Sequence, residues 1–304
     1  MPKKNKNRLY FESLRLERWP RSLAIIPGFV AFVVLNPDYL KNNDLLLLAV
    51  KLFAAFLLTL FISTANYIIN EITDATSDAF HPHKKDRPLV KKEIGKTILI
   101  GLWCVLVAVS IIAALIFYEN RFFLWDLMAL LAAGLLYNVP PLRVKDIPFL
   151  DSTLESANNP IRFLIGWHIV STAFPPVWLL ISWWFFGNFL MVGKRVAEKK
   201  FLSEEESSGY RLSLKKYSLK ALIAFMIFNA LVFIVSYALF AVQSGLHTFL
   251  FAIPFILFYL AMFMRKSVQD IEGAEEPEKL LKNPYFAAYT LFLVVIFVLA
   301  YIFR

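Results

Sequence analysis

The chain has 304 residues, of which 59% are hydrophobic and only 18% are charged, and this balance excludes an ordinary soluble globular protein. Its net charge of +9 is no evidence for nucleic-acid binding, because the basic residues gather in the segments between long apolar runs. The single cysteine, Cys104, excludes a disulfide or a thiolate metal site within the chain.

Nine apolar runs are long enough to cross a bilayer, and they predict an all-α polytopic membrane protein. The runs cover approximately residues 21–36, 45–69, 97–118, 122–138, 152–173, 175–193, 219–242, 247–264 and 285–303. The fifth run is the least apolar, and it could merge with the sixth. We expect a single transmembrane domain over residues 1–304, built as a bundle of nine helices.

Positive residues favour the cytoplasmic side of a membrane, and they divide unevenly between the two ends of the predicted spans. One side carries 27 Lys and Arg residues, and the other carries three. We therefore expect a multi-pass protein of the cell (inner) membrane with its N-terminus in the cytoplasm. Its basic inner face suits anionic lipid headgroups or phosphorylated substrates.

The polar stretch at residues 66–87 follows the second apolar run and holds the candidate metal site. If the helix continues past Ile69, residues four apart share one face, because four residues turn an α-helix by about 400°. The side chains in that register are Asn66, Asn70, Asp74 and Asp78. Hard oxygen ligands at this spacing suit Mg²⁺, which substrate phosphates usually complete. We therefore predict that Asn70, Asp74 and Asp78 are metal ligands.

Basic side chains follow directly, and they could hold the phosphates of a bound diphosphate. The predicted ligands among them are His81, Lys84 and Arg87. The alternative is a membrane helix that ends in a solvated polar cap, since charged runs at helix ends are common. Acids in register, followed by a block of bases, favour the diphosphate site.

The loop between the fourth and fifth spans, residues 137–151, contains three prolines that prevent a regular helix. Its predicted substrate-binding groups are Tyr137, Arg143 and Lys145, and Asp151 is a further polar group at its end. The alternative is an ordinary proline-stiffened connection with a basic flank.

Ionisable side chains are costly at membrane depth, so the polar face of the fifth span indicates either a substrate cavity or a structural polar network. The face consists of Glu155, Asn158, Asn159 and Arg162, which recur at helical spacing. We favour the cavity, with Asn159 and Arg162 as substrate-binding residues.

The segment from the end of the sixth span to the start of the seventh is rich in bases and has no aspartate. Its predicted substrate-binding residues are Lys194, Arg195, Glu198, Arg211 and Tyr217. No Asp occurs anywhere between residues 152 and 269, so this half of the chain lacks a second aspartate-rich motif.

These motifs resemble those of the UbiA superfamily of intramembrane prenyltransferases. The run NEITDATSD at residues 70–78 is similar to the first motif of that superfamily, NDxxDxxxD, with Glu71 in place of the usual Asp. The loop at residues 137–151 is similar to the loop after the fourth span of many members. Nine spans with a cytoplasmic N-terminus also fit.

Within the superfamily, the chain most resembles the polyprenyl-phosphate phosphoribosyltransferases. Three runs carry this resemblance: DAFHPHKKDRP at residues 78–88, GKRVAE at 193–198 and RLSLKKY at 211–217. Gly273 with Pro277 and Glu278 is similar to a late GxxxPE motif. Users of prenyl diphosphates carry a second aspartate-rich motif after the sixth span, where this chain has Lys194, Arg195 and Glu198.

The resemblance implies Mg²⁺-dependent transfer of a 5-phosphoribosyl group from phosphoribosyl diphosphate to a polyprenyl phosphate, with release of diphosphate. Asn70, Asp74 and Asp78 would be the catalytic, metal-holding residues, and the bases would grip phosphates. One alternative is a UbiA-type prenyltransferase that moves an isoprenoid chain to an aromatic or polyene acceptor. Another is a non-enzymatic lipid-binding or transport protein.

Overall fold

The computed structural model describes residues 6–79, 84–201, 212–269 and 283–303, and these residues form helices without a β-strand among them. The α-helices are α1 (Lys6–Ser13), α2 (Ile26–Leu35), α3 (Leu45–Asp78), α4 (Lys96–Phe117), α5 (Arg121–Asn138), α6 (Leu150–His168), α7 (Val177–Phe201), α9 (Leu212–Lys216), α10 (Leu219–Gln243), α11 (Ile253–Gln269) and α14 (Pro284–Ile302). Short 3₁₀ helices are η1 (Leu16–Ile25), η2 (Lys84–Asp86), η3 (Val144–Asp146) and η4 (His247–Ala252). The predicted all-α class is confirmed.

The chain divides into two compact units, each with its own apolar core. Unit 1 consists of Met1–Lys145 and Asn158–Pro175, and unit 2 consists of Asp146–Ala157 and Pro176–Arg304. Helix α6 therefore contributes its first turns to unit 2 and the remainder to unit 1. The single domain expected over residues 1–304 stays a prediction.

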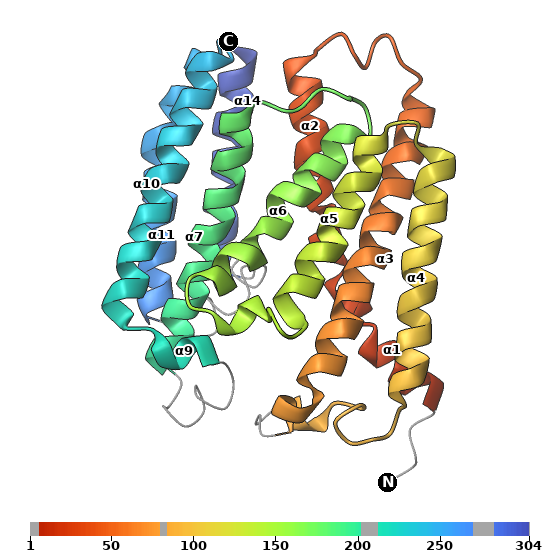
Figure 1. The fold of residues 1–304 in the computed structure, drawn as a ribbon. Coiled ribbons are helices and arrows are strands. Elements are labelled where there is room, and N and C mark those ends of the chain that lie inside the picture. The colour runs from red at the N-terminus through yellow and green to blue at the C-terminus, as the bar shows by residue number, and fades with distance from the viewer. Residues whose placement is uncertain (1–5, 80–83, 202–211, 270–282, 304) are drawn as a thin grey trace. The chain divides into compact units, whose positions relative to one another are not determined.

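Unit 1 is built on α3, a helix of 34 residues that α4 and α5 flank (Figure 1). No Gly or Pro interrupts α3, so its hydrogen-bond ladder continues from the apolar run into the polar stretch. Fully buried Ile62, Leu127 and Leu130 pack between α3 and α5. The helix continues past Ile69 and ends only at Asp78, so the condition for the shared face of Asn70, Asp74 and Asp78 is met.

Two glycines in unit 1 let α2 and α6 approach to backbone contact. A Cβ at Gly28 would lie 1.9 Å from the carbonyl oxygen of Phe163, and one at Gly166 would lie 1.8 Å from that of Ile25. Neither position can carry a side chain without separating the helices. Small residues at such crossings are typical of membrane helices, which associate through close packing instead of the hydrophobic effect.

Unit 2 is built on α7 and α10, which lie side by side, with α11 packed against α7 (Figure 1). Its core contains the fully buried side chains of Phe189, Met226 and Phe263. Aromatic rings dominate this core, and Phe189 and Phe263 meet at a centroid distance of 5.4 Å. Such aromatic contacts stabilise the core of this unit.

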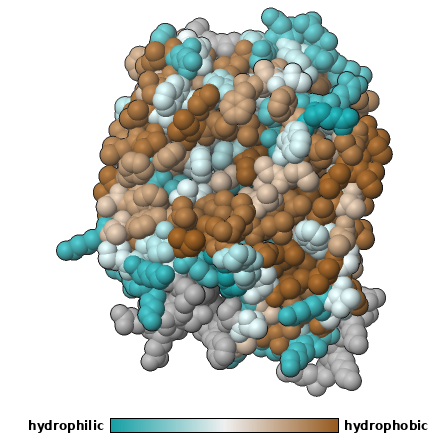
Figure 2. All heavy atoms as spheres, viewed as in Figure 1, coloured by the Kyte–Doolittle hydropathy of each residue, from teal (hydrophilic) through white to brown (hydrophobic). Residues whose placement is uncertain are grey.

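Eight helical segments of the described chain are long and apolar enough to cross a membrane. They match eight of the nine predicted spans, and the remaining one is α6, which is helical but carries Pro160 and the polar face from Glu155 to Arg162. Large apolar side chains lie exposed along α3, α4 and α14. Figure 2 shows hydrophobic atoms over much of the visible surface and hydrophilic ones gathered toward the top and bottom of the view. This surface suits a bilayer.

Candidate active site

The last turns of α3 bring the predicted metal ligands onto one face. Asn70 Nδ2 donates a hydrogen bond to Asp74 Oδ2 at 3.0 Å, which confirms the expected contact between residues four apart. Asn66, one turn earlier, donates from Nδ2 to the carbonyl oxygen of Leu130 on α5 at 2.8 Å. Asn66 and Asn70 thus both face α5.

Two basic residues from the loop after α5 bind the carboxylate of Asp74. Lys145 Nζ forms an ion pair with Asp74 Oδ1, and Arg143 Nη2 lies 3.1 Å from the same oxygen. Lys145 also donates to Asn138 Oδ1 at 3.1 Å. We call Asn70, Asp74, Asn138, Arg143 and Lys145 the Asp74 cluster. One carboxylate faces two cations here, so the cluster has an excess of positive charge.

The backbone of this loop is held in an unusual conformation. Arg143 has a φ of 31°, a region that side-chain-bearing residues rarely occupy. Its side chain also donates from Nη1 to the carbonyl oxygen of Thr73 at 3.3 Å, so two adjacent residues of α3, Thr73 and Asp74, hold it. Strained residues persist where the surroundings over-determine them, and they are frequent at functional sites.

Asp78, one turn beyond Asp74, has a different basic partner. It is buried and forms an ion pair with Arg87, which follows η2. The predicted contacts of His81 and of the Lys84 side chain lie outside the described residues. Glu71, the departure from the superfamily pattern, is buried and accepts hydrogen bonds from Ser13 at 3.3 Å and Arg15 at 3.4 Å. Its carboxylate therefore ties α3 to the N-terminal segment.

The residues of the Asp74 cluster fit Mg²⁺ as a partial ligand set. Within the described ranges, no group of three or more His, Cys, Asp or Glu side chains could hold a metal. Mg²⁺ needs fewer, because one or two carboxylates together with waters and substrate phosphates usually complete its octahedron. Asp74 supplies a carboxylate, and Asn70 uses its amide nitrogen for hydrogen bonds, which leaves Oδ1 as its remaining ligand atom.

Unit 2 contains a second polar cluster, in which one arginine is enclosed by carboxylates. Arg195 is fully buried, and its three nitrogens each donate to a different acid. Nε lies 3.0 Å from Asp151, Nη2 lies 2.5 Å from Glu155, and Nη1 lies 2.8 Å from Glu198. Direct phosphate binding by Arg195 stays a prediction, since the bonds present are to carboxylates.

Two hydroxyl groups also donate hydrogen bonds to Asp151. Ser213 Oγ donates to Asp151 Oδ2 at 3.0 Å, and Tyr217 OH donates to Oδ1 at 2.5 Å. Burial, and then the negative charge of Asp151, raise the pKa of Tyr217, so its hydroxyl stays protonated and can donate. We call Asp151, Glu155, Arg195, Glu198, Ser213 and Tyr217 the Arg195 cluster.

The other predicted site residues are less closely tied to either cluster. Lys194 Nζ lies 3.9 Å from Glu198 Oε1, and buried Arg162 donates from Nη2 to Ser63 Oγ at 3.2 Å. Tyr137 and Asn159 are half-buried, and Arg211 lies outside the described residues.

Several residues of the clusters were not predicted as site residues. They are Asn138, Asp151 and Ser213, whereas Glu155 was predicted as part of the polar face of the fifth span. The detectable sequence feature was a polar side chain at the end of an apolar run, as at Asn138, or in its first turns, as at Asp151 and Glu155.

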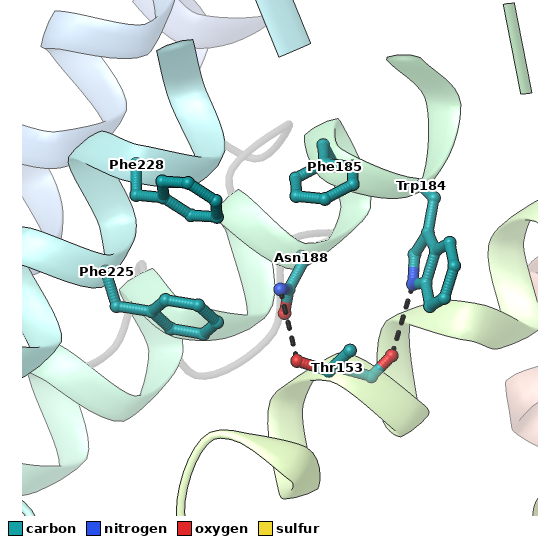
Figure 3. Close-up of a pocket in the computed structure, with 6 residues that line it drawn as sticks. All are labelled: Thr153, Trp184, Phe185, Asn188, Phe225 and Phe228. Atoms are coloured by element: carbon teal, nitrogen blue, oxygen red, sulfur yellow. Dashed lines mark hydrogen bonds between the residues drawn. The ribbon is translucent and has the colours of Figure 1, made fainter. Parts of the chain in front are cut away.

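A small aromatic pocket of about 160 Å³ lies in unit 2 between the start of α6, α7 and α10 (Figure 3). Its lining residues are Thr153, Trp184, Phe185, Asn188, Phe225 and Phe228. Trp184 Nε1 donates to the carbonyl oxygen of Thr153 at 3.2 Å, and Asn188 Nδ2 lies 3.4 Å from Thr153 Oγ1. Asn188 Nδ2 also donates to Asn229 Oδ1 at 2.8 Å, whereas Asn188 Oδ1 has no hydrogen-bond partner among the described residues. The walls of the pocket are mostly aromatic rings.

The family model described as "UbiA prenyltransferase family" matches residues 24–196, which is more than half of the chain. The chain belongs to the UbiA prenyltransferase family. The resemblance seen in its motifs is confirmed, and the matched residues of this UbiA protein include both α3 and Arg195.

Curated relatives of this UbiA protein carry the name decaprenyl-phosphate phosphoribosyltransferase. The one from Mycobacterium tuberculosis (strain H37Rv) is 26% identical over 271 residues, covering 88% of this chain and 85% of the relative. That from Mycolicibacterium smegmatis is 27% identical over 293 residues, covering 92% and 87%. These values support a transferase and leave its substrates open.

Solved structures similar to this UbiA protein confirm the fold. A UbiA homolog from Archaeoglobus fulgidus bound to GPP and Mg²⁺ has a TM-score of 0.68 at 17% identity, covering 94% of this chain and 98% of that one. A digeranylgeranylglyceryl phosphate synthase has a TM-score of 0.63 at 17% identity, covering 98% and 97%. At such low sequence identities, these comparisons show a shared fold and nothing about substrates.

Proposed function

We propose that this protein transfers the 5-phosphoribosyl group of phosphoribosyl diphosphate to a polyprenyl phosphate, in an Mg²⁺-dependent reaction at the cytoplasmic face of the membrane. The observation that carries the proposal is the Asp74 cluster, in which a carboxylate at the end of a membrane helix meets two cations. The relatives named decaprenyl-phosphate phosphoribosyltransferase support it, since they align over most of the chain.

The charges of the Asp74 cluster suit a diphosphate together with a divalent cation. Asp74 and Asn70 would hold Mg²⁺, which when bound neutralises charge on the diphosphate. Lys145 and Arg143 contact one oxygen of Asp74, and phosphate oxygens are stronger partners for their N–H groups. Asp78 and Arg87 repeat this pairing of an acid with a base one turn later.

The proposed reaction needs no general base. An oxygen of the lipid phosphate attacks C1 of the ribose, and the bond from C1 to the diphosphate oxygen breaks with its electron pair on the diphosphate. The attacking phosphate is already anionic, so no proton has to be removed. Lys145, Arg143 and Arg87 stabilise the negative charge that develops on the leaving diphosphate, and such fixed charges are usually a large term in catalysis.

The aromatic pocket of unit 2 suits a segment of the isoprenoid chain. Phe185, Phe225 and Phe228 give it apolar walls, and Asn188 Nδ2 donates to Thr153 Oγ1 at 3.4 Å. Its volume of about 160 Å³ allows only a short apolar segment to enter, so it would anchor a part of the lipid chain.

Prenyl transfer is the second candidate function. The family is named for it, and the solved structure with a TM-score of 0.68 has GPP bound. The absence of Asp between residues 152 and 269 favours the phosphoribosyl reaction, because users of prenyl diphosphates carry a second aspartate-rich motif in that region.

Parallel incubations of the purified protein test the assignment. One contains radiolabelled phosphoribosyl diphosphate, Mg²⁺ and a polyprenyl phosphate, and the other contains a radiolabelled prenyl diphosphate with an aromatic acceptor. We expect labelled lipid only in the first, and no product when the metal is chelated. Label that appears only in the second would contradict the phosphoribosyl assignment and favour prenyl transfer.

A further inference from the structure

Asn138, the last residue of α5, joins three parts of the Asp74 cluster through one amide group. It is 4% exposed. Its Nδ2 donates to the carbonyl oxygen of Gly134 at 2.9 Å, which fixes the orientation of the amide. Its Oδ1 accepts from Asn70 Nδ2 at 2.6 Å and from Lys145 Nζ at 3.1 Å. Every polar atom of the Asn138 side chain is therefore bonded.

These bonds decide which atom of Asn70 remains for a ligand. The Asn70 amide nitrogen has two hydrogens, and its two acceptors are Asn138 Oδ1 and Asp74 Oδ2. Its Oδ1 accepts no hydrogen bond in the described structure. A cation attracts that oxygen and repels an N–H group, so the orientation shown is the one that can bind a metal.

Asp74 cannot secure this orientation alone. Its carboxylate is the strongest ligand of the cluster, so a bound cation competes with Asn70 Nδ2 for its oxygens. Asn138 has a neutral amide anchored to the α5 backbone at Gly134, and its bond to Asn70 does not depend on a cation. Partners behind a ligand commonly set its orientation and the affinity of the site.

A close approach of the helices makes this contact possible. A Cβ at Gly134 would lie 2.1 Å from Cγ of Asn66, so any larger residue there would displace the Asn66 side chain, which bonds α5 at the carbonyl oxygen of Leu130. The separation of these helices also sets the distance between Asn70 and Asn138. The Asn138 contact is therefore supported by packing one turn earlier.

We propose that Asn138 is a positioning residue that turns the Asn70 carbonyl oxygen toward a divalent cation. The inference rests on the proposed function, because it presupposes that Asn70 and Asp74 form a cation site. In this proposal Asn138 does not itself touch the cation. Loss of the Asn138 acceptor weakens cation binding because the Asn70 amide is no longer held in the required orientation.

Mn²⁺ binding to the full chain in lipid nanodiscs, followed by electron paramagnetic resonance, tests the proposal without any turnover. We expect Asn138→Leu to weaken Mn²⁺ binding by roughly tenfold, the usual effect of removing such a partner. In an Asn70→Ala background the same substitution should weaken it less than about twofold, because a residue that acts through Asn70 has nothing left to orient. An equal loss in both backgrounds, or no loss in the first, would overturn the proposal.

Two further variants separate this effect from misfolding. Asn229→Leu removes a fully buried asparagine of unit 2 that donates to the carbonyl oxygen four residues earlier, as Asn138 does, and should leave Mn²⁺ binding unchanged. Asn138→Ser is smaller than Asn138→Leu and should fold while still losing Mn²⁺ affinity. If Asp74→Asn retains full Mn²⁺ affinity, the cation site itself is wrong. If Asp74→Asn loses Mn²⁺ affinity and neither Asn138 variant does, the cation site is supported and only the positioning role of Asn138 fails.

Discussion

The two polar clusters have opposite charge arrangements. In the Asp74 cluster one carboxylate faces two cations, and the side chains of Asp74 and Arg143 are 15% and 26% exposed. In the Arg195 cluster one fully buried guanidinium faces three carboxylates. The residues of the Asp74 cluster carry a net positive charge, which would attract an incoming anion. In the Arg195 cluster, the guanidinium is already paired with carboxylates of the same cluster.

This difference indicates different roles. A partly exposed cluster can exchange its partners for a ligand, because water compensates the groups that move. A buried arginine cannot leave its carboxylates without an uncompensated charge, which makes it a fixed junction. Arg195 joins Asp151 and Glu155 of α6 to Glu198 of α7, and through Asp151 it reaches Tyr217. We therefore expect chemistry at the Asp74 cluster and rigidity from the Arg195 cluster.

The largest expected effect is on turnover. Asp74→Asn should lower kcat by about a thousandfold while the protein stays folded, because it removes the anionic ligand and leaves two cations without their shared partner. Labelled-lipid formation, with size-exclusion chromatography as a folding check, measures this. Asp86→Asn, which breaks an exposed pair with Lys91, is the control and should be close to wild type. Full activity of Asp74→Asn would contradict a catalytic role and would favour the alternative that these polar residues only cap the helix.

Next comes the stability of unit 2. Arg195→Met should lower the free energy of unfolding by about 3–5 kcal/mol, the usual cost of leaving buried acids without their partner. Thermal unfolding in detergent or nanodiscs measures the loss. A variant with unchanged stability but much weaker use of the ribosyl donor would contradict the fixed-junction interpretation and would restore Arg195 as a phosphate ligand.

A smaller effect is expected when one cation of the Asp74 cluster is removed. Lys145→Met should lower kcat/KM for the donor by about ten- to a hundredfold, since a charge-assisted hydrogen bond contributes about 1.5–3 kcal/mol. Steady-state kinetics with varied donor measures it. The matched substitution Lys194→Met, at a lysine 3.9 Å from Glu198, should cost less, and the reverse order would place donor binding in unit 2.

The smallest expected effect concerns a single hydroxyl group. Tyr217→Phe should lower the free energy of unfolding by about 1 kcal/mol, because Asp151 keeps its bonds to Arg195 and Ser213. The raised pKa of Tyr217 means that the hydroxyl does not ionise near neutral pH, so the loss should be the same at pH 6 and pH 8. A loss that changes between these pH values would contradict a neutral donor.

Much of the fold followed from local sequence features. Apolar runs separated by charged segments predicted the helices, and the register of the acids assumed that the helix continues past Ile69, as α3 does. The fifth span was the weakest prediction, and α6 is the one predicted span that is not apolar enough to count as a candidate.

The sequence by itself determined the membrane class, the helical register of Asn70 and Asp74, and the presence of bases near them, because each depends on residues close together in the chain. Only the tertiary structure decided which bases meet which acids. Lys145 reaches Asp74 across 71 residues and Arg195 reaches Asp151 across 44, and such pairs depend on how helices pack. The sequence indicated phosphate binding for both basic residues equally. Their carboxylate partners distinguished them, because both are buried but Arg195 is enclosed by three carboxylates and Lys145 shares one with Arg143.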